Sequence, residues 1–374
     1  MKKFIPSVAN IHGVDLSTYK VIKRNQLACK LMSVGRDEQL PVDILKEYET
    51  AIVSAAYYVF ESADERLLLS DYLMMWLSRR ETDRWVGYIS GGDVRGGISW
   101  EQFCELPIFI PPIEQQMYVV QTNKSITSRI RLTDNLVHKS AETLQAIYKR
   151  WFIEFEFPIS SEYASFIGKP ELVGTPYKSN GGEMVYCEDL EQEIPKGWRY
   201  ARLDEMATIN AGGDVPEVFS EVVSEECSIP IYSNSTEKEG IFGYTDKAKI
   251  TKKCITISAR GAIIGYTVLR LKPFFPIVRL IIVTPKEGCF LYYLYESIKN
   301  LKYDSGASAQ GQLTIPEVSA IRLLEPDQSI MKKFQNMALA MGSFTEVIKS
   351  QNKVLTDLLT ILSAKMSGRR NEIH

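Results

Sequence analysis

The sequence predicts an α+β protein in which two mixed α/β domains are each followed by a long helix, with a pseudo-two-fold internal repeat. Three observations predict this class. One segment occurs twice, each copy precedes a stretch with heptad spacing, and short β-rich segments fill much of the remainder. At 374 residues the chain is also too long for one compact core.

The internal repeat places residues 89–111 (ISGGDVRGGISWEQFCELPIFIP) over residues 304–326 (DSGASAQGQLTIPEVSAIRLLEP) without a gap, at an offset of 215 residues. Gly96 then falls on Gly311, and Ile98 falls on Leu313. Each copy contains a Gly-rich turn, a polar stretch, an alternating apolar strand and a proline stop. The two copies are therefore expected to share local structure.

Heptad spacing predicts a long helix after each copy. In residues 119–151 one series is Ile130, Val137, Leu144 and Trp151, and the other is Val119, Ile126, Thr133, Ser140 and Ile147. After residue 326 one series is Phe334, Met341, Ile348, Leu355 and Leu362, with Met337, Phe344, Gln351 and Leu358 three positions later. We expect these seams to pair with each other and the polar members Thr133, Ser140 and Gln351 to help fix the register. The alternative is that each helix packs on its own domain.

Between the helices, residues 155–195 contain scattered prolines and a Gly-Gly pair, which indicates a linker or a loosely packed domain entry. Five β-rich segments follow at 208–210, 229–232, 254–258, 262–268 and 278–284, and related pieces occur at 19–22, 51–60 and, as a helix, 70–78. The expected organisation is a mixed domain at 1–110, a helix at 111–155, a mixed domain at 156–325 and a helix at 326–374.

The length of the apolar runs, the cysteine and histidine content and the net charge exclude or disfavour several classes of protein. No apolar run is long enough to span a membrane or to form a signal-peptide core, so a cytoplasmic protein is expected. The six cysteines form no CxxC pair and only three histidines accompany them, which favours buried reduced thiols over a metal site. The net charge of −2 does not suggest a nucleic-acid binder, which needs basic residues clustered on one face or supplied by partners.

A set of ordered motifs resembles the specificity subunit of a type I restriction-modification system. These are Gly197-Trp198, Gly212-Gly213, ISARGAIIG at 257–265 and LPIFIPPIEQQ at 106–116. The resemblance covers nearly the whole chain and depends on the order, spacing and duplication of the motifs. It implies that each mixed domain is a target-recognition domain for one half of a split DNA site, and that the two helices form an antiparallel coiled coil that sets the gap.

The resemblance also implies partners. These are double-stranded DNA, two methyltransferase subunits and restriction subunits. The chain itself is expected to need no cofactor, because S-adenosylmethionine and ATP would bind the partner subunits only. One departure is that the counterpart of Gly197-Trp198 would fall about eighteen residues before Met1. The first domain is therefore expected to be shortened, built differently or completed by another polypeptide.

Reading bases requires side chains with paired donors and acceptors, supported by Lys and Arg on phosphates. Asn234 and Gln312 are candidates for adenine, Arg260 for guanine or a phosphate, and Lys238 for the DNA backbone. The other candidates are Tyr232, Ser233 and Gln310 in the second domain, and Lys30, Ser33, Arg36 and Arg95 in the first. The alternative for each is a solvated or turn-forming residue.

Catalysis is the opposing hypothesis, and its motifs are absent from the sequence. There is no GxxxxGK[ST], no NPPY-like tetrad, no HExxH and no GxSxG. The Gly-Gly pairs at 91–92 and 212–213 are expected to be tight turns instead of phosphate loops. The remaining alternatives are the specificity subunit of a related bifunctional restriction system and an assembly scaffold that does not read DNA.

Overall fold

The computed structural model describes residues 16–32, 34, 39–90, 96–260, 264–286, 291–301, 303 and 312–366. The chain divides into two compact units, residues 1–136 with 347–374 (unit 1) and residues 137–346 (unit 2). The boundaries fall inside the two long helices, α5 (Ile113–Tyr148) and α10 (Gln328–Lys365). The four-part division expected from the sequence stays a prediction.

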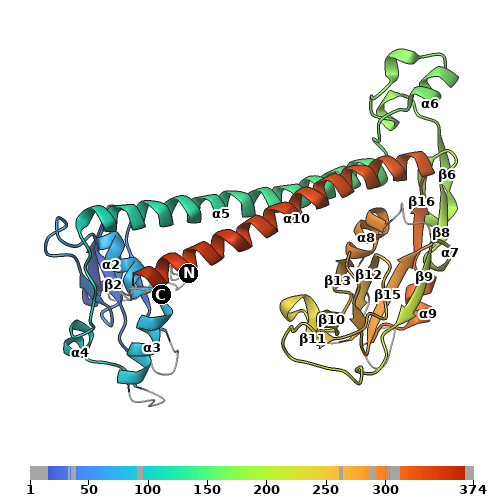
Figure 1. Ribbon diagram of the computed structural model, residues 1–374. Helices are drawn as coiled ribbons and strands as arrows, with labels where there is room; N and C mark the ends of the chain where they lie inside the picture. Colours follow the sequence, from blue (N-terminus) through green and yellow to red (C-terminus); the bar gives the residue numbers. More distant parts are fainter. Residues whose placement is uncertain are drawn as a thin grey trace, which may run out of the picture. The chain divides into compact units, whose positions relative to one another are not determined.

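Unit 1 contains the first module, a small antiparallel β-structure covered by helices (Figure 1). Strand β2 (Leu27–Cys29) lies between β3 (Val42–Ile44) and β5 (Tyr58–Phe60), while β1 (Lys20–Lys23) pairs with β4 (Thr50–Val53). A 3₁₀ turn (Leu16–Thr18) precedes them, and helices α2 (Ser70–Leu77), α3 (Arg80–Ile89) and α4 (Trp100–Cys104) follow. The core joins Leu27, Tyr72 and Phe103 to Val120 of α5 and to Met366.

Unit 2 contains the second module, built on the four-stranded sheet β13-β12-β15-β9, with α8 (Leu291–Lys299) beside it (Figure 1). These strands are Thr267–Arg270, Cys254–Ser258, Leu280–Pro285 and Ala207–Ala211. A second sheet has the order β11 (Ile241–Thr245), β10 (Ile229–Tyr232) and β14 (Phe275–Pro276). The smaller elements are α7 (Leu203–Met206), η6 (Glu237–Gly240), α9 (Ile315–Ala320) and the pair β8 (Arg199–Arg202) with β16 (Arg322–Glu325).

Residues 155–195 form a packed domain entry, so the interpretation as a linker is wrong. Phe157 stacks on Tyr177 at 4.5 Å and on Trp198 at 5.2 Å between ring centroids, which ties this segment to the core of unit 2. Pro170 begins a 3₁₀ turn, Pro195 ends β7, and Pro158 and Pro176 form an isolated β-bridge. A π-helical turn (Lys149–Ile153) precedes the segment, whose elements are α6 (Ser161–Phe166), 3₁₀ turns at Pro170–Leu172, Lys178–Asn180 and Glu188–Leu190, and the hairpin β6 (Met184–Cys187) with β7 (Gln192–Pro195).

The internal repeat is visible in local structure. Helix α4 begins with a capping box between Ser99 and Gln102, and α9 begins with one between Thr314 and Glu317. These residue pairs are 215 positions apart, as are the first residues of α5 and α10. The predicted strand exists only in the second copy, as β16, because none of the described residues pairs with residues 107–110.

The facing sides of α5 and α10 include members of both predicted series on α5 and of the first predicted series on α10. Thr133 of α5 is buried and donates a hydrogen bond from Oγ1 to Oδ1 of Asn352 at 2.7 Å. In unit 2 the rings of Trp151 and Phe334 lie 6.3 Å apart. The second series on α10 is displaced by one residue from the prediction, since Asn352 is buried while Gln351 is exposed. The supercoil of a coiled coil stays a prediction.

Each module is fixed to its long helix by a buried glutamine. In unit 1, Gln116 of α5 accepts a hydrogen bond from the amide of Leu69 at 3.0 Å and donates to the carbonyls of Leu67 and Pro111, both at 2.8 Å. In unit 2, Gln335 of α10 accepts from the amide of Tyr292 at 3.0 Å. Both amides lie at the start of a module helix, where backbone donors have no partner within the helix.

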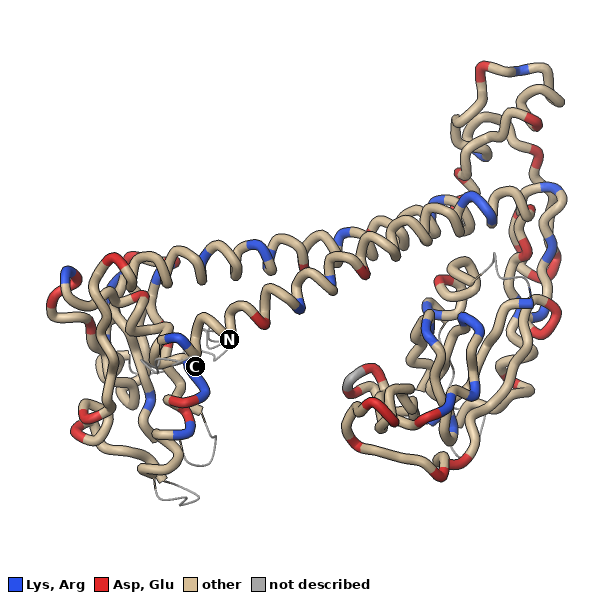
Figure 2. Tube along the Cα trace, viewed as in Figure 1, with Lys and Arg blue, Asp and Glu red and all other residues tan. Residues whose placement is uncertain are grey.

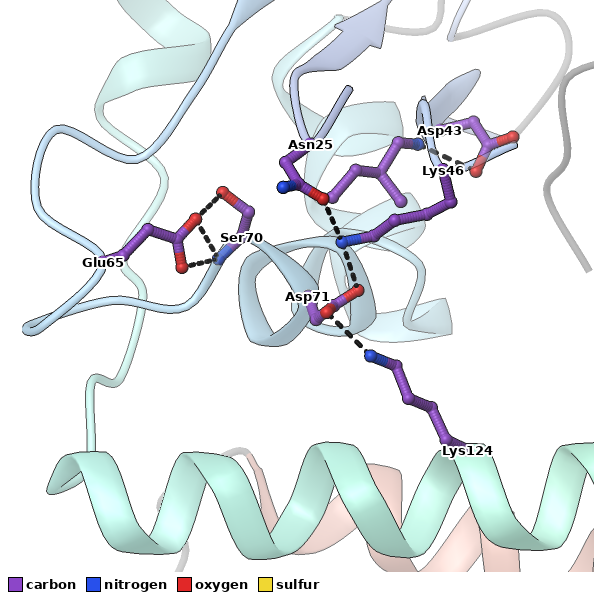
Figure 3. A network of polar contacts seen from close by, with 8 residues as sticks. Asn25, Asp43, Lys46, Glu65, Ser70, Asp71 and Lys124 are labelled. Atoms are coloured by element: carbon purple, nitrogen blue, oxygen red, sulfur yellow. Dashed lines mark hydrogen bonds and ion pairs between the residues drawn. The ribbon is translucent and has the colours of Figure 1, made fainter. Parts of the chain in front are cut away.

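Charged groups add to the attachment of the first module (Figure 3). Asp71 of α2 lies 3.0 Å from the ammonium of Lys46 and 2.9 Å from that of Lys124 on α5. Partial burial tends to raise the pKa of Asp71, but the hydrogen bonds from Lys124 and Lys46 outweigh it and lower the pKa. Glu65 receives hydrogen bonds from the amide and hydroxyl of Ser70 at the start of the same helix.

The cysteine prediction is only partly right. Cys29, Cys227 and Cys254 are buried and free, but Cys104 is exposed and Cys187 is half-buried, because both lie at the margins of their modules. Cys289 lies outside the described residues.

Candidate nucleic-acid interface

Strand register brings several polar side chains to one end of the four-stranded sheet of unit 2. Ser258 of β12 pairs with Leu280 of β15. Arg260 follows the first strand and Arg279 precedes the second, so both exposed arginines lie at what we call the Ser258–Leu280 end. β9 also finishes here, since Ala211 pairs with Ile281.

The backbone at this end is held from two sides. The amide of Ala259 donates to Oδ1 of Asn234 at 3.2 Å, and the carbonyl of Ala259 accepts from the amide of Leu313 at 2.8 Å. The Ser258 hydroxyl also donates to the Asn234 carbonyl at 3.3 Å. Asn234 therefore positions the residue before Arg260, and its carboxamide oxygen is already engaged.

Gln312 lies next to Leu313 and accepts a hydrogen bond from the guanidinium of Arg279. This contact holds Arg279 at the sheet end without neutralising its charge, because a carboxamide carries none. Gln312 and Arg260 were expected from the sequence, whereas Arg279 was not among the candidates.

Gly212 and Gly213 follow β9, and their role is close backbone packing. A Cβ atom at Gly212 would lie 2.3 Å from the carbonyl oxygen of Ile277, so a side chain there requires the backbone to move. At Gly213 it would lie 3.2 Å from the ammonium of Lys249, which places this second missed cation beside the glycine pair. The glycines thus let the strands approach, but residues 212–213 do not form the expected tight turn, and residues 91–92 lie outside the described residues.

Tyr232 and Ser233 make packing and backbone contacts at the C-terminal end of β10. The guanidinium of buried Arg270 lies 3.6 Å from the ring centroid of Tyr232 and donates to Oγ1 of Thr256 and to the carbonyl of Glu239. Burial lowers the pKa of Arg270 and raises that of Tyr232. The amide of Ser233 donates to the Gly240 carbonyl at 2.8 Å, which closes the turn containing η6.

The remaining predicted residues are not brought into this cluster. Lys30 follows β2 in the first module, is half-buried and donates its amide to the Pro41 carbonyl at 2.9 Å. Ser33, Arg36, Arg95 and Gln310 lie outside the described residues, as does the side chain of Lys238. The convergence of Arg36, Arg95, Lys238 and Arg260 therefore stays a prediction.

The charge of unit 2 is segregated along the sequence. Residues 247–286 contain nine Lys or Arg and no Asp or Glu, and all of these cations except Arg270 are exposed. Figure 2 shows several basic positions in the second module. Residues 214–226 contain five acidic residues and no basic ones, and they attach to edge strand β11 through paired Ser220–Tyr244 backbone hydrogen bonds. A chain with a net charge of −2 thus still has the local basic excess that phosphate binding requires.

The described residues also bear on two other classes of function. No described helix is both long enough and apolar enough to cross a membrane. Among the same residues, no three His, Cys, Asp or Glu side chains are grouped so that they could hold a metal ion.

Comparison with known proteins finds a family model that matches the second module. Residues 195–341 match the family model described as the type I restriction modification DNA specificity domain. A putative type I specificity subunit of Mycoplasma pneumoniae is 30% identical over 48% of this chain and 51% of its own length. The HindI specificity subunit of Haemophilus influenzae is 22% identical over 96% of this chain and 89% of its own length.

Structural comparison supports the fold. The crystal structure of a type I restriction-modification S subunit from M. genitalium matches with a TM-score of 0.61. The match covers 93% of this chain and 84% of that one, at 14% sequence identity. At this level of identity the match shows a shared fold and leaves the function to be argued from the residues.

Proposed function

We propose that the chain belongs to the type I restriction-modification specificity-subunit family and that it binds double-stranded DNA through the Ser258–Leu280 end of its second module. Specificity subunits are non-catalytic, so family membership supports the expectation that this chain carries no active site. Its role is then to recognise a sequence and to direct partner subunits to it.

The observation that carries this proposal is the grouping of exposed cations with a hydrogen-bonding amide at one end of a rigid sheet. Arg260 and Arg279 can each donate two parallel hydrogen bonds to the O6 and N7 atoms of guanine or to a phosphate. Gln312 presents a carboxamide NH₂ group that can donate to a base edge, since its oxygen already accepts from Arg279, and Lys249 adds a charge suited to the DNA backbone. The sheet holds these groups in place, so little ordering is needed on binding.

The test compares charge removal at the two ends of β12. Arg260→Gln with Arg279→Gln removes two cations from the Ser258–Leu280 end, and Lys252→Gln with Lys253→Gln removes two exposed cations that precede the same strand. DNA binding by the full chain with its methyltransferase subunit would be measured over a salt series. The first variant is expected to lose affinity and reduce the salt slope by about two, at roughly 0.9 per phosphate contact.

The control variant is expected to bind specific DNA nearly as the unchanged chain does. Equal losses in both variants would show that the basic segment acts only through net charge. No loss in either variant would favour the scaffold alternative.

We further propose that the two modules read a split site and that partner subunits dock on the helices. The repeated capping boxes, the long-helix starts and the buried glutamines support two comparable modules held on rigid spacers. Helix α10 also carries an exposed apolar stripe away from its buried seam, with side chains 45–66% exposed, which suits a partner helix. Its members are Phe344, Val347, Val354, Leu358 and Ile361.

Two methyltransferase subunits would match two modules, and restriction subunits would complete a cleaving assembly. S-adenosylmethionine and ATP would then be bound by these partners. The related bifunctional system, in which one partner chain both methylates and cleaves, makes the same demands on this chain.

A further inference from the structure

The two modules share more structure than the sequence repeat indicates. In the second module, the amide of Leu313 donates to the carbonyl of Ala259, the first residue after β12. In the first module, the amide of Ile98 donates at 3.1 Å to the carbonyl of Leu31, two residues after β2. Ile98 and Leu313 are equivalent in the repeat, so Leu31 and Ala259, both buried, occupy equivalent places.

The strand topology agrees with this equivalence. β2 and β12 are each the central strand between two antiparallel neighbours, and a helix follows the later neighbour in both modules. In each module the first neighbour is the next strand in the sequence. The equivalence extends the repeat to segments where the residues themselves have diverged.

Met32 therefore occupies in the first module the position that Arg260 occupies in the second. Each is the residue directly after the hydrogen-bonded carbonyl, and each is exposed, Met32 to 60%. Leu31 accepts from Ile98 as Ala259 accepts from Leu313, so the two side chains leave their modules at matching positions. One is a cationic hydrogen-bond donor and the other is an apolar thioether.

Small residues stand in the first module at the positions equivalent to Gln312 and Arg279. The repeat places Gly97 at the position of Gln312. Cys29 pairs with Tyr58 as Ile257 pairs with Ile281, which places Ala56 at the position of Arg279. A Cβ atom at Gly97 would lie 2.7 Å from the Leu31 carbonyl oxygen, so the backbone approaches too closely for a side chain.

We infer that Met32 is the specificity-determining residue of the first module at the place where the second module uses Arg260, and that it contacts the 5-methyl group of a thymine. This inference rests on the proposed function. An exposed methionine beside a glycine and an alanine offers no hydrogen bonds, and the apolar feature of a base edge in the major groove is the thymine methyl. The two half-sites therefore differ at this position.

The experiment maps N6-methyladenine genome-wide in a methylation-free host that expresses the chain with its methyltransferase subunit. Four chains are compared: the unchanged chain, Met32→Ala, Met32→Arg and Arg260→Met. Met32→Ala is expected to relax one base position in one half-site, and Arg260→Met one position in the other. The loss of discrimination at Arg260 is expected to be roughly tenfold to a hundredfold, from the worth of one bidentate base contact.

A binding assay separates the thymine contact from other causes. Deoxyuridine in place of the thymine at the Met32-dependent position removes only the methyl group. It should weaken binding by the unchanged chain and leave binding by Met32→Ala unaffected. An equal effect on both chains would overturn the assignment of the thymine.

The outcomes for the inference and for the proposed function are distinct. Methylation that does not depend on the chain defeats both. Chain-dependent methylation with both half-sites intact in Met32→Ala, or with Met32 and Arg260 variants altering the same half-site, defeats the inference alone. Met32→Arg tests the equivalence directly, since it should change the preferred base in the half-site that Met32→Ala relaxes.

Discussion

Gln116 shows how much a single buried side chain can matter in this chain. It is completely buried and uses both ends of its carboxamide on the backbone of the first module. From the sequence, Gln116 was noted only as part of the LPIFIPPIEQQ motif. Its burial was not predicted, because periodicity identifies apolar faces and gives no signal for a buried amide. The same limit applies to Asn352. The heptad spacing of Phe344 and Leu358 placed the predicted seam at Gln351, one residue earlier.

Replacing Gln116 by Leu is expected to destabilise unit 1 by about 1–3 kcal/mol, since the Leu69 amide and the carbonyls of Leu67 and Pro111 lose their partner. Urea unfolding followed by tryptophan fluorescence would measure the change. Gln115→Leu is the matched control, because Gln115 is the neighbouring exposed residue of the same helix. Similar losses in the two variants would contradict the bonding role.

The buried carboxyl of Glu296 in α8 is expected to make the stability of unit 2 depend on pH. Its carboxylate is buried, Oε2 has no hydrogen-bond partner, and Lys299 lies 3.9 Å away. Burial raises its pKa, with a smaller opposing effect from Lys299. A carboxyl with a raised folded-state pKa favours the folded state below its unfolded pKa of about 4.3, and this contribution is lost as the pH rises through the folded value.

Glu296→Gln is therefore expected to raise the unfolding temperature at pH 7 and to leave it nearly unchanged at pH 4. Glu142→Gln provides the control, since that exposed carboxylate has a lowered pKa from the hydrogen bond of Lys139. A destabilisation of the same size at both pH values would mean that the shape of Glu296, and not its charge, matters.

At the scale of elements, heptad spacing predicted both long helices, and short apolar runs predicted β10 and β12 at their observed limits. Residues 155–195 could not be predicted in the same way, because their packing depends on aromatic contacts with Trp198, which lies beyond them in sequence. The candidate interface was found in part. Asn234, Arg260 and Gln312 do converge, but Arg279 joins them only through the register of β12 and β15.

The contact between Thr133 and Asn352 fixes a testable register for α5 and α10. In an antiparallel pair, Ile130 lies three residues before the first and Leu355 three after the second, so they should face each other. Cysteines at 130 and 355 are expected to form a disulfide under mild oxidation. Cysteines at 130 and 362, one heptad away, should not, and preferential cross-linking of that second pair would show a different register.

At the scale of the whole molecule, the two modules share a design in which a rigid β-structure is fixed to a long helix by a buried glutamine. If the helices set the gap between two half-sites, one heptad inserted into each should widen that gap and leave both half-sites unchanged. The helical periodicity tolerates a seven-residue insertion because it restores the seam. Changed half-sites with an unchanged gap would contradict this prediction.

We propose that this chain selects the DNA sequence on which its partners act. A methylome tests this in a methylation-free host that expresses the methyltransferase subunit alone, with this chain, or with the Arg260→Gln, Arg279→Gln variant. A split motif is expected with the unchanged chain, no motif with the methyltransferase subunit alone, and a motif less defined in one half-site with the variant. The same motif without the chain, or no methylation with it, would show that the chain does not select the sequence.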